Sequence, residues 1–329
     1  MESATVACDN KVFFLPVNTG YGKSGNPDNR LIDFHRERSG NGIYCSIIGN
    51  VVTPKGFGSN DYCLTITKHK NWKIIAEEIL GNGSVPGIQL STAWKDYKGN
   101  QKFVSSSSDD FSQYTEKFLK VSCSEIDEVF DDFYKGVNLA LNAGYKHIQI
   151  HAAHGYLLSL LVDSVFCENS HYTLTKLNEL LDYIRSQNSE SSVRFSLKVG
   201  IQSIDKIRQE GISRILQLNS DYFDISFGFY NINKHLIYPT SVSMLKSRYD
   251  NSIALANQYP DKEFIFSGKS LVNFEGEFPS NVSLGICRDL IANPKYLINN
   301  TVGCENNKQC HYFSRGERSL SCKKWLEKN

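Results

Sequence analysis

The chain has 329 residues, 40% of them hydrophobic, and its formal net charge at pH 7 is +1. This length suits one large domain or two, and the apolar fraction is sufficient for a substantial core. A charge so close to zero argues against a strongly basic surface for nucleic acid or for an anionic membrane.

The cysteines and the N-terminal region indicate the compartment. Nine cysteines occur at irregular spacings, which argues against a disulfide framework and favours a reducing environment. The apolar run at 12–15 is too short for a signal peptide, and no segment approaches the roughly 20 apolar residues of a membrane span. We therefore expect a soluble cytoplasmic protein.

Short apolar segments typical of buried strands alternate along the chain with segments of helical periodicity. Strands are expected at 11–17, 43–48, 85–90, 146–150, 193–198, 221–226, 263–267 and 282–286. Helices are expected at 28–38, 70–81, 123–143, 156–187, 203–217, 239–259, 269–275 and 288–299. Eight strands, each followed by a helix, predict a (β/α)8 TIM barrel. The alternative is a doubly wound open sheet, but no GxGxxG follows any strand.

The stretch 146–161, KHIQIHAAHGYLLSLL, combines a strand with three chemically capable side chains. His151, His154 and Tyr156 stand where a strand ends and a helix begins, which is where parallel α/β folds place their chemistry. On spacing alone, two structural histidines explain the pattern about equally well. A zinc-protease motif would need histidines four apart on a helix and a glutamate, and this stretch has neither.

The longer segment 123–159 resembles the old yellow enzyme family, which are FMN-dependent NAD(P)H:enone oxidoreductases on (β/α)8 barrels. The resemblance lies in an amphipathic helix, then AGY, a strand ending in IH, and AAHGYL. It implies that His151 and His154 bind the carbonyl oxygen of a substrate and that Tyr156 donates a proton. It also implies FMN as cofactor and NAD(P)H as electron donor.

The same resemblance implies flavin contacts at the first three strand ends. Pro16, Val17 and Asn18 match a segment that lies along the flavin, although the family usually has Thr or Cys at the Asn18 position. An ordinary loop asparagine remains the alternative there. Gly49 falls where a small residue admits the isoalloxazine ring, and Gln89 where a glutamine hydrogen-bonds the pyrimidine edge.

The later strand ends extend the predicted flavin site. Lys198 aligns with a family arginine near flavin N1, where a cation stabilises the negative charge of the reduced flavin. The alternative is a lysine that pairs with a barrel carboxylate. Ser267, Gly268, Cys287 and Arg288 resemble the phosphate-binding loops after the last two strands, a common phosphate site of TIM barrels.

Two departures from the family stand out. The family's arginine-rich, Gly-Gly loop after HGY is missing at 163–172, which puts nicotinamide binding and substrate choice in doubt. Cys310 and Cys322 keep the spacing of the last two ligands of an iron–sulfur cluster, but Gly303 and Asn306 replace the first two. We therefore predict no metal. A zinc site built from Cys304, Cys310, His311 and Cys322 is the alternative.

We thus expect one FMN-binding barrel at 1–302 and a C-terminal extension at 303–329 with a vestigial cysteine cluster. Hydride would pass from NAD(P)H through flavin N5 to an activated, α,β-unsaturated small-molecule substrate. No nucleic-acid or membrane partner is expected, and a homo-oligomer stays open. The alternative is a divergent flavoprotein with a specialised biosynthetic redox role, or a flavin-binding barrel that lacks ene-reductase activity.

Overall fold

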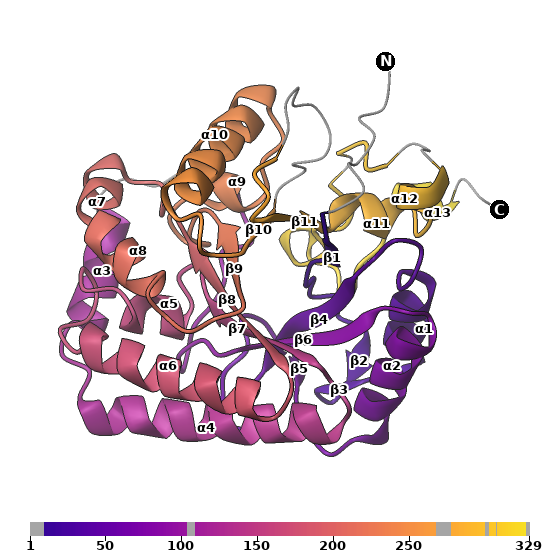
Figure 1. The fold of residues 1–329 in the computed structure, drawn as a ribbon, viewed down its shortest axis with the longest axis horizontal. Coiled ribbons are helices and arrows are strands. Elements are labelled where there is room, and N and C mark those ends of the chain that lie inside the picture. Colours follow the sequence, from indigo (N-terminus) through magenta and orange to yellow (C-terminus); the bar gives the residue numbers. More distant parts are fainter. Residues whose placement is uncertain (1–9, 104–108, 268–277, 300–302, 307, 327–329) are drawn as a thin grey trace.

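The computed structural model describes residues 10–103, 109–267, 278–299, 303–306 and 308–326. Eight parallel strands form a closed barrel, since β4 pairs both with β6 and back with β1 (Figure 1). This confirms the predicted (β/α)8 barrel. In barrel order the strands are β1 (Val12–Phe14), β4 (Cys45–Val52), β6 (Val85–Ser91), β7 (His147–Ala152), β8 (Glu190–Ser196), β9 (Tyr222–Ser226), β10 (Phe264–Phe266) and β11 (Val282–Ile286).

Helices surround the barrel where the sequence predicts them, and local signals explain their bounds. The longest begins at a capping box, in which Ser122 and Glu125 each hydrogen-bond the other's backbone N–H. The helices that cover the barrel are α1 (Asn29–Glu37), α2 (Lys70–Gly81), α4 (Cys123–Asn142), α6 (Ser170–Ser186), α7 (Gln202–Ile207), α8 (Gln209–Ile215), α10 (Val242–Gln258) and α11 (Arg288–Ala292).

Three predicted helices differ from the structure. The one expected at 288–299 is divided into α11 and α12 (Tyr296–Asn299). The segment expected as one helix at 156–187 is two, α5 (Leu157–Leu161) and α6. Asp163 ends the first, because its side chain accepts the backbone N–H of Val165 at 3.0 Å and an N–H of Arg208 at 2.5 Å. The segment expected at 203–217 is likewise divided into α7 and α8, and the helix expected at 269–275 lies outside the described residues.

The barrel interior is polar along its middle. On β7 the alternate residues His147, Gln149 and His151 are buried, while Ile148 and Ile150 join the main hydrophobic cluster with helix residues. Gln149 connects β6 with β9 across the barrel interior. It accepts from Gln89 on β6 at 2.6 Å and donates to Asp224 on β9 at 3.2 Å.

The described part of the C-terminal extension packs on the barrel. The Leu320 backbone pairs with Thr19, and its carbonyl accepts the hydroxyl of Tyr21 at 2.7 Å. Trp325, in α13 (Lys323–Leu326), donates to the carbonyl of Ile291 at 2.8 Å. The extension is therefore continuous with the barrel core, next to β1 and β11 (Figure 1).

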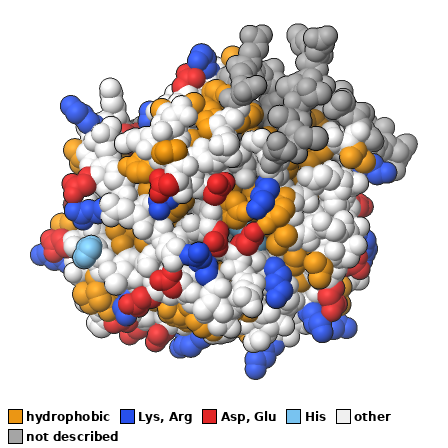
Figure 2. Space-filling view, in the orientation of Figure 1, with side chains coloured by type: hydrophobic (Ala, Val, Ile, Leu, Met, Phe, Trp, Pro, Cys, Tyr) orange, Lys and Arg blue, Asp and Glu red, His pale blue; other side chains and the backbone are white. Residues whose placement is uncertain are grey.

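The surface mixes both signs of charge, in keeping with the net charge of +1 (Figure 2). Within the described ranges, every helix is too short or too polar to cross a membrane.

Candidate active site

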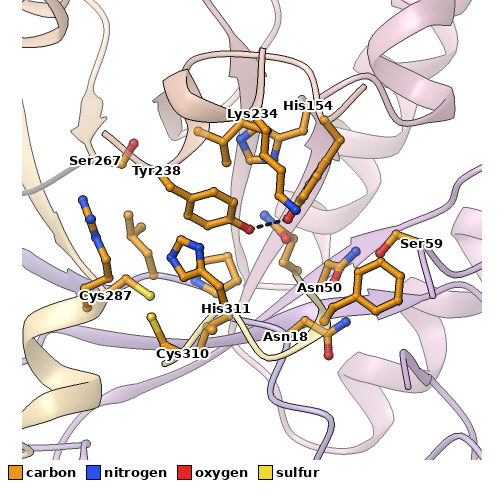
Figure 3. A pocket seen from close by; sticks show the side chains of 18 of the residues that line it. Asn18, Asn50, Ser59, His154, Lys234, Tyr238, Ser267, Cys287, Cys310 and His311 are labelled. Atoms are coloured by element: carbon orange, nitrogen blue, oxygen red, sulfur yellow. Dashed lines mark hydrogen bonds between the residues drawn. The ribbon is translucent and has the colours of Figure 1, made fainter. Parts of the chain in front are cut away.

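A cavity opens at the carboxyl ends of the barrel strands (Figure 3). It brings together most of the residues predicted as a site, although they are spread over more than 270 positions of sequence. The predicted residues that line it are Pro16, Val17, Asn18, Gln89, His151, His154, Tyr156, Ser267, Cys287 and Arg288.

The chain turns sharply after β7, and this turn places the central motif. His154 (φ +64°) and Gly155 (φ +78°) are successive left-handed residues, a conformation that glycine adopts without cost. A Cβ on Gly155 would lie 3.0 Å from the ring of Phe229. The turn brings the ring of His151 to 5.1 Å from that of His154 and 4.9 Å from that of Tyr156, between centroids.

Each histidine uses one ring nitrogen inside the protein. His151 Nδ1 accepts the backbone N–H of Ala153 at 3.1 Å, so a neutral ring carries its proton on Nε2. His154 Nε2 lies 2.6 Å from the hydroxyl of Ser226, so its Nδ1 is the other nitrogen available to an occupant. Each ring therefore keeps one nitrogen for a bound molecule.

Burial and a nearby cation keep both histidines neutral. Burial lowers the pKa of His151 and of His154 well below 6.5, and the positive charge of Arg194 lowers each further. A neutral imidazole that donates through one N–H can bind an oxygen that is gaining negative charge.

Tyr156 is 3% exposed and lies between aromatic rings. Its ring is parallel to that of Tyr230 (5.7 Å, 8°) and edge-on to that of Tyr97 (5.7 Å, 83°). Burial raises the pKa of Tyr156 well above 10, so the phenol keeps its proton at neutral pH. It can serve as a proton donor toward the cavity.

The predicted cation at Lys198 needs correction. Lys198 does not line this cavity but a separate pocket beside Phe227 and Leu236. Its charge instead lowers the pKa of Asp205, against a larger rise from burial. Because β8 ends at Ser196, the alternation of faces along the strand does not continue to Lys198.

On β8 the residue that lines the cavity with a positive charge is Arg194, which was not predicted from the sequence. It lies within β8 on the same face as Ser192 and Ser196, and a charged residue inside a buried strand was the available signal. Its Nε is 3.5 Å from Asp224 Oδ2, yet this Nε is buried without a hydrogen-bond partner among the described residues. Buried N–H donors are normally hydrogen-bonded to an acceptor.

Of the two glycines predicted to contact the flavin, one does not line the cavity and the other lies outside the described residues. Gly49 does not line the cavity, because a Cβ there would lie 2.9 Å from the Cβ of Gln89 and 3.3 Å from that of Pro16. The lack of a side chain at Gly49 makes room for the neighbouring Gln89 and Pro16. The next residue, Asn50, lines the cavity instead. Gly268 lies outside the described residues.

Asn18 has contacts of its own beside the cavity. Its amide donates to Cys63 Sγ at 3.2 Å and accepts the backbone N–H of Gly20 at 3.2 Å. It therefore also shapes the loop after β1, in line with the loop-asparagine alternative.

Cations gather at the end of the cavity near β10 and β11. Arg288 donates to the carbonyl of Pro239 at 2.7 Å, and Arg248 reaches in from α10 to the hydroxyl of Ser267. Burial, and then the charge of Arg194, lower the pKa of Arg248 to about 9, and its Nε is buried without a partner in the described structure. This end suits an anionic group.

The C-terminal cysteine segment forms one wall of the same cavity through Cys310, His311 and Tyr312. His311 packs its ring against those of Phe103 (5.2 Å, 19°) and Tyr238 (4.3 Å). The described residues contain no group of three or more His, Cys, Asp or Glu side chains placed to hold a metal ion. The zinc alternative at Cys304, Cys310, His311 and Cys322 therefore has no support from the geometry.

Sequence comparison connects this site with known proteins. The profile of the NADH:flavin oxidoreductase / NADH oxidase family matches residues 6–170, which is half of the chain. The NADH-dependent flavin oxidoreductase iliE of Hypocrea jecorina is 26% identical over 45% of this chain and 42% of its own length. A probable NADPH dehydrogenase of Candida albicans is 28% identical over 57% of this chain and 46% of its own length. These matches thus span less than two thirds of the relatives.

Solved structures share the fold over nearly the whole chain. The Old Yellow Enzyme from Pichia sp. AKU4542 superposes with a TM-score of 0.67 at 16% identity, over 96% of this chain and 89% of its own. A 2-naphthoyl-CoA reductase superposes with a TM-score of 0.72 at 16% identity, over 95% of this chain and 54% of its own. The chain therefore belongs to the NADH:flavin oxidoreductase / NADH oxidase family and has the barrel fold of the old yellow enzymes.

Proposed function

We propose that this protein is an FMN-dependent oxidoreductase of the old yellow enzyme type, which takes electrons from NAD(P)H and reduces an activated alkene. One observation carries the proposal. A single cavity combines two neutral histidines, a protonated tyrosine and guanidinium groups whose Nε atoms lack a hydrogen-bond partner among the described residues. Bound FMN would supply the hydride chemistry, by accepting hydride from the nicotinamide and returning it to the substrate.

The residues present fit FMN. Arg194 and Gln89 lie together on the β6–β8 side of the cavity and offer donors to the pyrimidine edge of the ring. Arg288 and Ser267 lie on the β10–β11 side, with Arg248 behind them, and suit the phosphate. The Nε atoms of Arg194 and Arg248 have no hydrogen-bond partner among the described residues, which suits an occupant with acceptor atoms.

The chain's own groups would act on the substrate from the β7 side. His151 Nε2–H and His154 Nδ1–H would hold the substrate's carbonyl oxygen as it gains negative charge. Tyr156, whose phenol stays protonated, would give its proton to the α-carbon. We expect this small-molecule reaction to take place in the cytoplasm.

A specialised flavoprotein without general ene-reductase activity is the second candidate. The observation that favours it is the altered rim. The chain after HGY forms a tight turn fixed by the Asp163–Arg208 ion pair, and the C-terminal segment from Cys310 to Ser314 takes part in the cavity wall. Both features restrict the substrates that the cavity can accept, compared with a cavity that lacks these walls.

The test begins with the purified protein. It should be yellow, release FMN on denaturation, and be reduced anaerobically by NADH or NADPH. Reoxidation by a cyclic enone would support ene-reductase activity, whereas reduction without enone reoxidation would favour the second candidate. Colourless protein that does not bind added FMN would contradict both.

A further inference from the structure

Tyr156 has a proton-supply problem that follows from its burial. With 3% of its surface exposed, it has little direct contact with bulk water, and each turnover in the proposed function would leave it as a phenolate. The phenolate must recover a proton before the next turnover. The neighbouring groups that could supply one are Ser59, Tyr230 and Lys234, which line the same cavity.

Lys234 is not arranged to give this proton. Its ammonium donates to the carbonyls of Asn100 (2.8 Å) and Gln101 (3.2 Å) and to the hydroxyl of Ser314 (2.7 Å). All three of its hydrogens are therefore committed to the cavity wall.

Tyr230 is arranged to give it. Its ring stacks parallel to that of Tyr156 with centroids 5.7 Å apart, and burial raises its pKa while the hydrogen bond with Tyr238 opposes the rise. The hydroxyls of Tyr230 and Tyr238 lie 2.5 Å apart, the contact dashed in Figure 3. Tyr238, which is partly exposed, in turn packs against His311 and Phe103, and Phe103 contacts the exposed His235.

We propose that Tyr230 and Tyr238 form a proton relay that restores Tyr156 after each turnover, which rests on the proposed role of Tyr156 as the acid. Tyr230 passes its hydroxyl proton to the Tyr156 phenolate and takes one from Tyr238. Tyr238 takes its replacement proton from solvent water, so one proton enters for each proton delivered to the substrate. Hydroxyl chains of this kind pass protons without moving heavy atoms, because each group both donates and accepts.

Tyr97 provides a matched control. It flanks Tyr156 at the same ring distance of 5.7 Å, but it does not line the cavity. Its hydroxyl is buried with no hydrogen-bond partner among the described residues. Tyr97→Phe and Tyr230→Phe thus remove one hydroxyl each from the two sides of Tyr156, and only Tyr230→Phe interrupts the relay.

The experiment mixes the reduced holoenzyme with an enone and follows flavin reoxidation together with the ultraviolet absorbance of tyrosinate. Tyr230→Phe and Tyr238→Phe should complete the first turnover at nearly the parent rate. Their tyrosinate signal should then decay at least about tenfold more slowly, with a larger solvent deuterium effect on that decay. Tyr97→Phe should match the parent in both readouts.

Other outcomes separate the relay from the proposed function. Parent-like tyrosinate decay in Tyr230→Phe and Tyr238→Phe would overturn the relay, as would slowed decay in Ser59→Ala alone. A slower first turnover with unchanged decay would show that Tyr230 only positions Tyr156. If Tyr156→Phe reoxidises at the parent rate, the proposed acid itself is wrong.

Discussion

The two ends of strand β7 carry the same side chain in opposite conditions. At the amino end, His147 is fully buried and both ring nitrogens have partners, Glu190 Oε2 at 3.0 Å and Ser192 Oγ at 2.8 Å. At the carboxyl end, His151 is 3% exposed, and among the described residues only its Nδ1 has a hydrogen-bond partner.

The difference shows which end of the barrel is built for stability and which for chemistry. The His147 network is closed, because Glu190 also accepts the hydroxyl of Tyr44, and Lys11 lies 2.5 Å from the hydroxyl of Tyr222 nearby. Burial would raise the pKa of Glu190, but the hydrogen bonds with His147 and Tyr44 and the charge of Lys11 lower it overall. At the cavity end, Arg194 Nε has no hydrogen-bond partner among the described residues, although Asp224 lies 3.5 Å away.

The largest effect should come from Tyr156→Phe. Removal of the proposed acid should slow reoxidation by an enone about 10²–10⁴-fold, the usual range for general acid catalysis. Flavin reduction by NAD(P)H and phenol binding should stay close to the parent, because the histidines that hold the oxygen remain. Stopped-flow measurement of the two half-reactions checks this, and parent-rate reoxidation would remove Tyr156 from the chemistry.

The next largest effect separates the predicted cation from the observed one. Arg194→Met should weaken FMN binding by about 1.5–3 kcal/mol and lower the flavin potential, because a charge-assisted contact is lost. Lys198→Met is the matched control and should leave both unchanged, since Lys198 lies in another pocket. FMN titration and potentiometry measure the two quantities. A loss of potential in Lys198→Met alone would restore the original prediction.

At the closed end, His147→Phe should change stability but not chemistry. The phenyl ring keeps the packing against Phe13 and Tyr222, whereas Glu190 and Ser192 each lose a hydrogen-bond partner. The free energy of unfolding should fall by about 1–3 kcal/mol, with both half-reactions unchanged. Urea unfolding and stopped-flow kinetics test this, and altered kinetics at equal stability would contradict the division between the two ends.

The smallest effect concerns Lys234 and pH. Burial lowers its pKa from 10.5 to about 8, so between these values the unfolded chain binds more protons than the folded chain. Stability contributed by this group therefore rises as pH increases from about 8 to 10.5. The free energy of unfolding of Lys234→Met should not show this rise with pH. Urea unfolding of both proteins across that pH range tests this. If their stabilities changed equally with pH, Lys234 would be exposed to solvent.

Periodicity predicted the eight barrel strands well because each is a short apolar run bounded by turns. The same signal could not divide 156–187 into two helices. The break depends on Asp163 meeting Arg208, 45 positions later in the chain. Similarly, the family resemblance placed the flavin-contacting cation at Lys198, because the sequence does not show where β8 stops.

The sequence by itself determined the barrel, the family and the central motif, since local periodicity and the HAAHGYL stretch are properties of contiguous residues. The tertiary structure decided which cation faces the cavity and whether each histidine nitrogen is free. It also brought Tyr230, Tyr238 and the C-terminal segment around Tyr156. The residues around Tyr156 lie about 75 to 160 positions further along the chain, and only the closure of the barrel brings them to it.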